Sequence, residues 1–204
     1  MSKQQAKNNN NNGANDLVER LISVNKVSKT VKGGKNLSFS ALVIVGDKNG
    51  KVAYAKGNAV EVVSAKNKAF EAARKKMIKF SLKEGRTIHH DAVGRFCSAK
   101  VYLRTAPPGT GVIAGGPMRA IFECAGINDI VAKSVGTSNP YNMVAATFDA
   151  LSGLLSPKYV AEKRSKEISE IVNKRNSALG IVTKAPKEAK KDTQESSTTT
   201  ENNE

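Results

Sequence analysis

Residues 24–45 read VNKVSKTVKGGKNLSFSALVIV, and this segment sets the architecture of the first half of the chain. Its beginning alternates apolar and polar residues, which is typical of a strand. Lys32-Gly33-Gly34-Lys35-Asn36 is a turn, because glycine adopts the positive φ that tight turns need. Residues 37–45 favour a second strand, and a turn over 46–50 leads to a third strand over 51–56. The segment therefore predicts three antiparallel strands.

A helix is expected on each side of these strands. Four apolar residues recur at i, i+1, i+4 and i+5 from Leu17 to Ile22, which predicts a short amphipathic helix. Ser64 can cap a second helix that runs to about Leu82, with alanines on one face and lysines on another. Helix, three strands and helix is the order of a double-stranded-RNA-binding domain, whose basic helix end and loops meet phosphates across the grooves.

The second half alternates strands and helices. Strands are predicted over 100–105 and 127–135, and helices over 117–125, from Pro140 to Leu155, over 157–164 and over 167–174. Proline fits the first turn of a helix, and Gly126 fits the end of one. This alternation predicts a two-layer α/β domain.

The predicted class is α+β, with four segments along the chain. These are an Asn-rich extension over 1–14, a double-stranded-RNA-binding-like domain over 15–84, a two-layer α/β domain with terminal helices over 85–174, and a tail over 175–204. The extension has almost no apolar residues, and the tail has no aromatic or β-branched apolar residue from 186 onward. Neither can offset the entropy of ordering, so both are predicted to be disordered.

The net charge of +15 predicts a polyanionic partner, either nucleic acid or an acidic membrane. Residues 16–86 carry +10 of this charge, whereas residues 87–156 carry only +1. The longest apolar run, Ala41–Val45, has five residues, far fewer than the roughly 20 of a membrane span, and no secretory signal is visible. We therefore expect a cytoplasmic chain that binds polyanions through its first half and faces protein neighbours through its second.

Lysines at every third position give the strongest binding signal. Lys26, Lys29, Lys32 and Lys35 suit contact with successive phosphates better than packing. The predicted RNA contacts are Lys26, Val27, Ser28, Lys29, Thr30, Lys32, Gly33, Gly34 and Lys35 on this loop, with Lys68, Lys75 and Lys79 on the following helix. The alternatives are an exposed hairpin tip and a solvated helix face.

A glycine-rich run over 109–116 suggests a nucleotide site, because N–H groups at a helix start can hold phosphate. Its spacing, GxGxxxGG, matches neither the dinucleotide motif nor the P-loop. The favoured interpretation is a tight turn whose glycines let another backbone, of protein or RNA, approach closely. His89-His90-Asp91 lacks a third ligand nearby, and Cys97 and Cys124 form no CxxC pair, so no metal site is expected.

No catalytic residue or cofactor is expected. Asp129 and Asp149 have no partner at a spacing that indicates acid/base chemistry, and no catalytic triad can be argued from two histidines. A kinase-like enzyme, the alternative, would need a catalytic base that the sequence does not supply.

Three motifs resemble the fifth protein of the bacterial small ribosomal subunit. They are residues 24–47, residues 109–119 and Ser138-Asn139-Pro140-Tyr141-Asn142, and the resemblance is collinear from about Leu17 to Ile171. It implies a structural rRNA-binding protein with no enzymatic activity. It also implies a first domain similar to the double-stranded-RNA-binding fold and a second similar to a unit of some small-molecule kinases.

The resemblance further implies the partners: small-subunit rRNA, ribosomal proteins four and eight, and mRNA where it enters the subunit. Gly111 and Arg119 match positions at the interface with protein four, where loosening is associated with altered decoding accuracy, and we assign Gly109, Gly115 and Gly116 to the same interface. We expect a protein that is not a homo-oligomer, stabilises the head of the subunit relative to its body, and contributes to translational accuracy. The alternative is a free-standing RNA chaperone.

Overall fold

The strand β2 (Gly34–Gly46) runs through a sheet that is covered on both faces along its inner half. In the computed structural model, which describes residues 17–172, all of Ala41–Val45 are buried. A sheet covered on both sides needs apolar side chains at successive positions, which explains the uninterrupted run. The predicted extension over 1–14 and tail over 175–204 lie outside the described residues.

The first sheet contains antiparallel strands in the order β1-β2-β3-β4. The other strands are β1 (Val18–Val31), β3 (Lys51–Ala59) and β4 (Ile78–Lys79). The helix α1 (Val62–Arg74) covers one face of this sheet. Gly57 of β3 permits a close approach, because a Cβ there would lie 2.3 Å from the Ala65 carbonyl oxygen. The predicted three strands and following helix are confirmed.

The helix predicted from Leu17 to Ile22 is wrong, because β1 begins at Val18 and includes the rest of this segment. The strand from Val18 to Leu21 pairs with the inner end of β2, and Ile22 is an extra residue that shifts the register. Leu17 packs into the core beneath α1, whereas Val18 and Ile22 pack against the opposite core. The apolar spacing thus reflects a bulged strand with partners on both faces, and the mixed helix-and-sheet class is confirmed.

The helix α1 also ends earlier than predicted, at Arg74 instead of near Leu82. The N–H of Lys76 donates to a carbonyl of the last turn, and the chain then pairs with β3 as β4. Phe80 follows and enters the core, where its N–H donates to the Gly50 carbonyl at 2.8 Å. Strand pairing and the burial of an aromatic ring outweigh the local helical pattern.

The second sheet has the order β7-β8-β10-β9, and α2 and α3 cover one of its faces. The elements are β7 (Ala92–Phe96), β8 (Ala99–Thr105), β9 (Val112–Ile113), β10 (Ile130–Val135), α2 (Gly116–Ala125) and α3 (Pro140–Ser152), preceded by a short hairpin of β5 (Leu82–Lys83) and β6 (Thr87–Ile88). Gly94 of β7 lets α3 approach, since a Cβ there would lie 2.0 Å from the Ala146 carbonyl oxygen. The predicted two-layer arrangement is confirmed.

The described residues divide into two compact units, with the boundary between Val160 and Ala161. The helix α4 (Pro157–Arg164) spans the boundary, and residues 168–172 are also helical, close to the predicted ranges. Between residues 17 and 172, no helix is both long enough and apolar enough to cross a bilayer.

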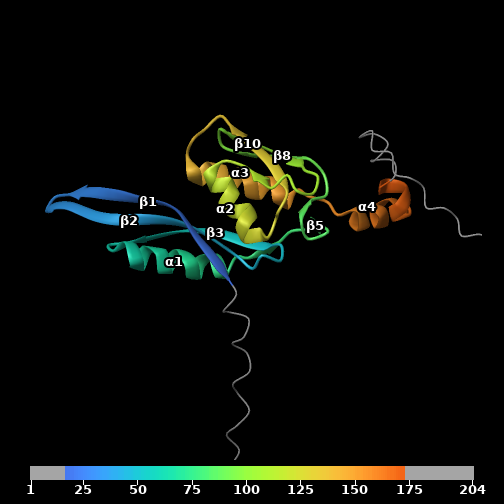
Figure 1. The fold of residues 1–204 in the computed structure, drawn as a ribbon. Coiled ribbons are helices and arrows are strands. Elements are labelled where there is room, and N and C mark those ends of the chain that lie inside the picture. Colours follow the sequence, from blue (N-terminus) through green and yellow to red (C-terminus); the bar gives the residue numbers. More distant parts are fainter. Residues whose placement is uncertain (1–16, 173–204) are drawn as a thin grey trace, which may run out of the picture. The chain divides into compact units, whose positions relative to one another are not determined.

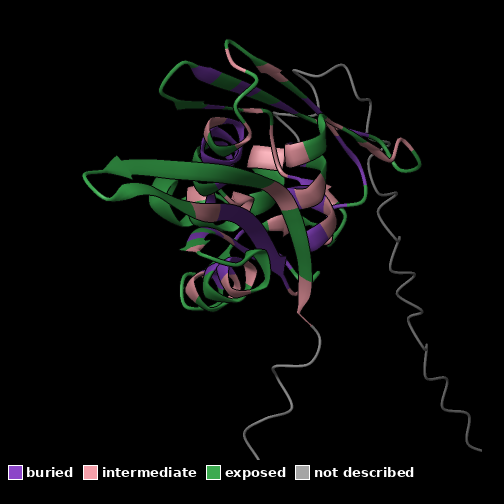
Figure 2. Ribbon diagram, turned by 90° about the vertical axis from the view of Figure 1, so that its left-hand side faces the viewer, coloured by how far each residue is buried: buried purple, intermediate pink, exposed green. Residues whose placement is uncertain are grey.

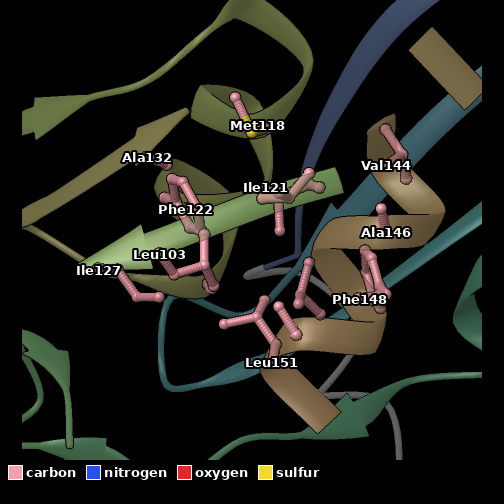
Figure 3. Close-up of a cluster of buried hydrophobic side chains, with 14 of the residues drawn as sticks. Leu103, Met118, Ile121, Phe122, Ile127, Ala132, Val144, Ala146, Phe148 and Leu151 are labelled. Atoms are coloured by element: carbon pink, nitrogen blue, oxygen red, sulfur yellow. The ribbon is translucent and has the colours of Figure 1, made fainter. Parts of the chain in front are cut away.

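Four layers follow one another in the first unit: α1, the first sheet, α2 with α3, and the second sheet (Figure 1). The middle of this stack is one hydrophobic cluster to which Phe122, Phe148 and Leu103 contribute (Figure 3). Tyr54 of β3 joins it, with its ring centroid 4.6 Å from that of Phe148. The division between residues 84 and 85 remains a prediction, and this shared core runs across it.

The turn between β2 and β3 caps the C-terminal end of α2. The N–H groups of Lys48 and Gly50 donate to the carbonyls of Cys124 and Ala125, at 3.0 and 2.9 Å. The last carbonyls of a helix have no partner within the helix, so these bonds satisfy them. Gly126 has a φ of 82°, and a Cβ there would lie 1.9 Å from the Lys48 carbonyl oxygen. Backbone contacts therefore join the first sheet to α2.

Candidate nucleic-acid interface

The outer parts of β1 and β2 form a two-stranded ribbon, residues 24–37, that extends away from the body (Figure 1). Every residue of this ribbon is exposed (Figure 2). Lys32 and Gly33 connect the strands, and Gly34 has a φ of 133°, which favours glycine. The predicted hairpin is confirmed, and its exposure leaves the side chains of both strands accessible.

The lysines of the ribbon lie on both of its faces. Side chains alternate along a strand, and directly paired residues share a face. Thr30 pairs with Lys35, so Lys26 and Lys35 share one face, whereas Lys29 pairs with Asn36 on the other. The three-residue spacing in the sequence therefore distributes positive charge around the ribbon instead of along one side.

No acidic residue occurs between Arg20 and Gly46. None of the ribbon lysines forms an ion pair with another residue of the described chain. Lys66 of α1 behaves differently, because its ammonium group bonds to the Glu19 carboxylate. The ribbon thus presents positive charge that is not neutralised by a neighbouring carboxylate.

The structure does not bring Lys68, Lys75 and Lys79 together on one helix. All three are exposed, but only Lys68 lies within α1, while Lys75 caps its C-terminus and Lys79 belongs to β4. Lys79 lies opposite Lys51 of β3. Lys51 was not among the RNA contacts predicted from the sequence. It becomes a neighbour of Lys79 only through the pairing of β3 with β4, which requires α1 to end at Arg74.

The glycine turn after β8 is organised by Asp129, which is 3% exposed. Its carboxylate accepts from the N–H groups of Gly109 and Gly111, each at 3.0 Å, and from the Arg86 guanidinium at 2.7 and 3.1 Å. The Gly111 N–H contributes most to holding the pKa of Asp129 below its ordinary value, and Arg86 adds to this effect against the opposing effect of burial. Asp129 therefore positions the turn.

Gly109 and Gly111 adopt a backbone conformation that favours glycine, and both lie next to open space. Their φ values are 89° and 75°, and an added Cβ at either would meet no atom within 4 Å. Gly115 and Gly116 begin α2, and Arg119 lies one turn further along. The Arg119 side chain bonds to Glu123, which also pairs with Arg20 of β1. The turn is thus accessible, while Arg119 pairs within α2 with Glu123, the residue that links α2 to Arg20 of β1.

The chain is similar to known proteins over both of its halves. Residues 17–81 match the family description "Ribosomal protein S5, N-terminal domain", and residues 94–164 match "Ribosomal protein S5, C-terminal domain". The small ribosomal subunit protein uS5 of Erythrobacter litoralis is 60% identical over 158 residues, which is 78% of this chain and 56% of that protein's length. The uS5 proteins of Zymomonas mobilis and Hyphomonas neptunium are 57% and 55% identical, over 79% of this chain and 70% and 81% of their own lengths.

Proposed function

Because this chain belongs to the ribosomal protein S5 family, we propose that its ribbon binds small-subunit rRNA through Lys26, Lys29, Lys32 and Lys35. The chain is a structural component of the small ribosomal subunit and not an enzyme, so the resemblance found in the sequence is confirmed and the kinase-like alternative is excluded. RNA binding is general in the family. The observation that supports the ribbon is its full exposure, with positive charge on both faces and no ion pair to a carboxylate of residues 17–172.

A ribbon with cations on two faces can meet phosphates on both sides of a groove. The minor groove of A-form RNA is wide and shallow, displays 2′-hydroxyls and base edges, and is bordered by phosphates, which suits contact by a narrow protein element. Val27, Ser28, Thr30, Gly33 and Gly34 lie between the lysines and are small enough to let the backbone approach RNA. Such phosphate contacts fix position and orientation and do not by themselves read sequence.

The second part of the proposal concerns the glycine turn and the start of α2. The accessible turn at Gly109 and Gly111, the start of α2 at Gly115 and Gly116, and Arg119 form a surface for ribosomal protein four, with protein eight also contacting the second half. The backbone bonds between the β2–β3 turn and α2 support a rigid link between this surface and the ribbon. That link would stabilise the head relative to the body, affect accuracy, and place the basic first half near incoming mRNA.

The salt dependence of RNA binding tests the ribbon. Lys29→Ala combined with Lys32→Ala should flatten the slope of log affinity against log salt concentration by about 0.7–0.9 for each lost phosphate contact. The matched control is Lys83→Ala with Lys158→Ala, which removes two exposed charges outside the ribbon. An unchanged slope in the ribbon variant contradicts the assignment. Association with small subunits in a gradient separates the ribosomal role from that of a free-standing RNA chaperone.

A further inference from the structure

The second sheet leaves its outer face uncovered by α2 and α3. The strand register sets Val93 and Lys133 beside Tyr102, and Lys100 beside Arg95 and Val135. All of these side chains are exposed. We call this surface the outer face, defined by the outward residues Val93, Arg95, Lys100, Tyr102, Arg104, Val131, Lys133 and Val135, with Ile113 at its edge.

The outer face concentrates the positive charge of a region that is nearly neutral overall. Residues 87–156 contain five cationic residues, and four of them point outward from this sheet: Arg95, Lys100, Arg104 and Lys133. No outward position is acidic. None of the four forms an ion pair with any residue for which the structure gives a position.

The acidic residues of the same region form hydrogen bonds and ion pairs within the fold, and none of them pairs with a cationic side chain of the outer face. Asp129 is buried against Arg86, and Glu123 on α2 pairs with Arg119. Asp149 accepts a bond from the Arg95 backbone N–H, and Asp91 accepts one from the Thr105 N–H. The near-zero net charge therefore results from carboxylates used within the fold and cations left on one surface.

This arrangement lowers stability in the absence of a partner. Arg95 and Lys100 are directly opposite each other on neighbouring strands, where like charges repel. A surface needed only for solubility would intersperse both signs and would not place Val93, Tyr102 and Val135 among the cations. An anionic partner would remove the repulsion and cover the apolar side chains.

We propose that the outer face is a second RNA-binding surface that contacts the phosphate backbone of structured RNA. The proposal rests on the proposed function, because it assumes a chain held within rRNA. Neighbouring strands are about 4.7–4.9 Å apart and alternate residues along a strand about 6.6 Å apart, so the cations form a flat array that a continuous polyanion can cross. Lysine and uncompensated charge are depleted in protein–protein interfaces and enriched in those with nucleic acid, which favours RNA over an acidic protein.

The test uses the full chain and small-subunit rRNA transcripts, with affinity measured across salt concentrations. Lys100→Gln with Lys133→Gln should make the slope of log affinity against log salt concentration shallower by about 0.7–0.9 per lost contact. The unfolding temperature should not fall, because both side chains are exposed and the loss of the Lys100 charge relieves its repulsion with Arg95. Arg95→Gln with Arg104→Gln, on the same face, provides an independent pair should the first fail to fold. Lys83→Gln with Lys158→Gln is the control of equal charge.

The outcomes separate this proposal from the one for the ribbon. A reduced slope in the outer-face variants and in the ribbon variant supports both surfaces. An unchanged slope in the outer-face variants overturns the outer face, whatever the ribbon variant shows. An unchanged slope in the ribbon variant alone overturns the ribbon and leaves the outer face. Outer-face variants that keep the slope but lose association with ribosomal proteins identify a protein-docking surface and also overturn the proposal.

Discussion

The two sheets of the first unit differ in how many of their faces are covered. The first lies between α1 and the pair α2 and α3, so successive residues of β2 such as Val43 and Ile44 are buried in different clusters. Among residues 17–160, the second is covered on one side only, by α2 and α3, so β8 alternates between buried Leu103 and exposed Tyr102. An uninterrupted apolar run and an alternating one therefore correspond to two-sided and one-sided burial.

The difference also explains how each sheet can meet RNA. A sheet covered on both faces has no free surface within the body, and it becomes accessible only where β1 and β2 extend beyond their neighbours as the ribbon. The second sheet is an outer layer of the first unit, so its face away from α2 and α3 lies at the edge of the body (Figure 1). The ribbon fits a groove, whereas the outer face fits a backbone that passes across it.

Alanine substitution along one strand of each sheet gives the largest expected effect. Ile44→Ala should lower the free energy of unfolding by about 2–5 kcal/mol, and Val43→Ala by somewhat less because it removes a smaller side chain, since both leave cavities in packed cores. In β8, Leu103→Ala should cost a similar amount, whereas Tyr102→Ala should cost no more than about 1 kcal/mol, the scale of cross-strand contacts on an exposed face. Chemical denaturation measures all four. Equal losses at Leu103 and Tyr102 would show that the outer face is packed.

A smaller effect on stability is expected from substitution of Asp129, whose carboxylate holds the glycine turn between β8 and β9. Its lowered pKa means that the folded chain prefers the ionised carboxyl. This stabilisation is complete above the pKa of the unfolded chain and is lost as pH falls through the lowered pKa of the folded chain. Asp129→Asn should therefore be less stable near neutral pH and should lose less stability on acidification. Parallel acid profiles for the variant and the natural chain would contradict this role.

Much of the fold follows from local sequence. The hairpin at Gly33 and Gly34, the strands around it, and the helices beginning near Pro117, Pro140 and Pro157 all have clear local signals, and the structure contains each of them. Positive φ at a turn and proline in a first helical turn are properties of the residues themselves.

The errors arose where distant partners decide the structure. The apolar spacing after Leu17 fits a helix, but the segment forms a strand because it pairs with β2. The helical pattern of α1 extends in the sequence beyond Arg74, but the helix ends there because the following residues pair with β3 as β4. Asp129 has no local sequence signal, because its donors lie 18 and 20 residues away at Gly111 and Gly109. The sequence shows the alternating polarity of β8. The cluster of cations on β7, β8 and β10 becomes visible only when the pairing register of the three strands is known.

The ribbon can be shortened without disturbing the sheet, because Val27 and Ser38 are directly paired. Replacing residues 28–37 with Asn-Gly closes a hairpin at this pair and removes Lys29, Lys32 and Lys35. The buried part of β2 is retained, so the variant should unfold at nearly the same temperature as the natural chain.

Sedimentation of this shortened chain with small ribosomal subunits at physiological salt is the most direct test of the account. The natural chain should travel with the subunits, and the shortened chain should be reduced in the subunit fractions and released from them at lower salt. A folded, shortened chain that stays with the subunits as tightly as the natural chain would contradict the central claim that the ribbon anchors this protein to RNA.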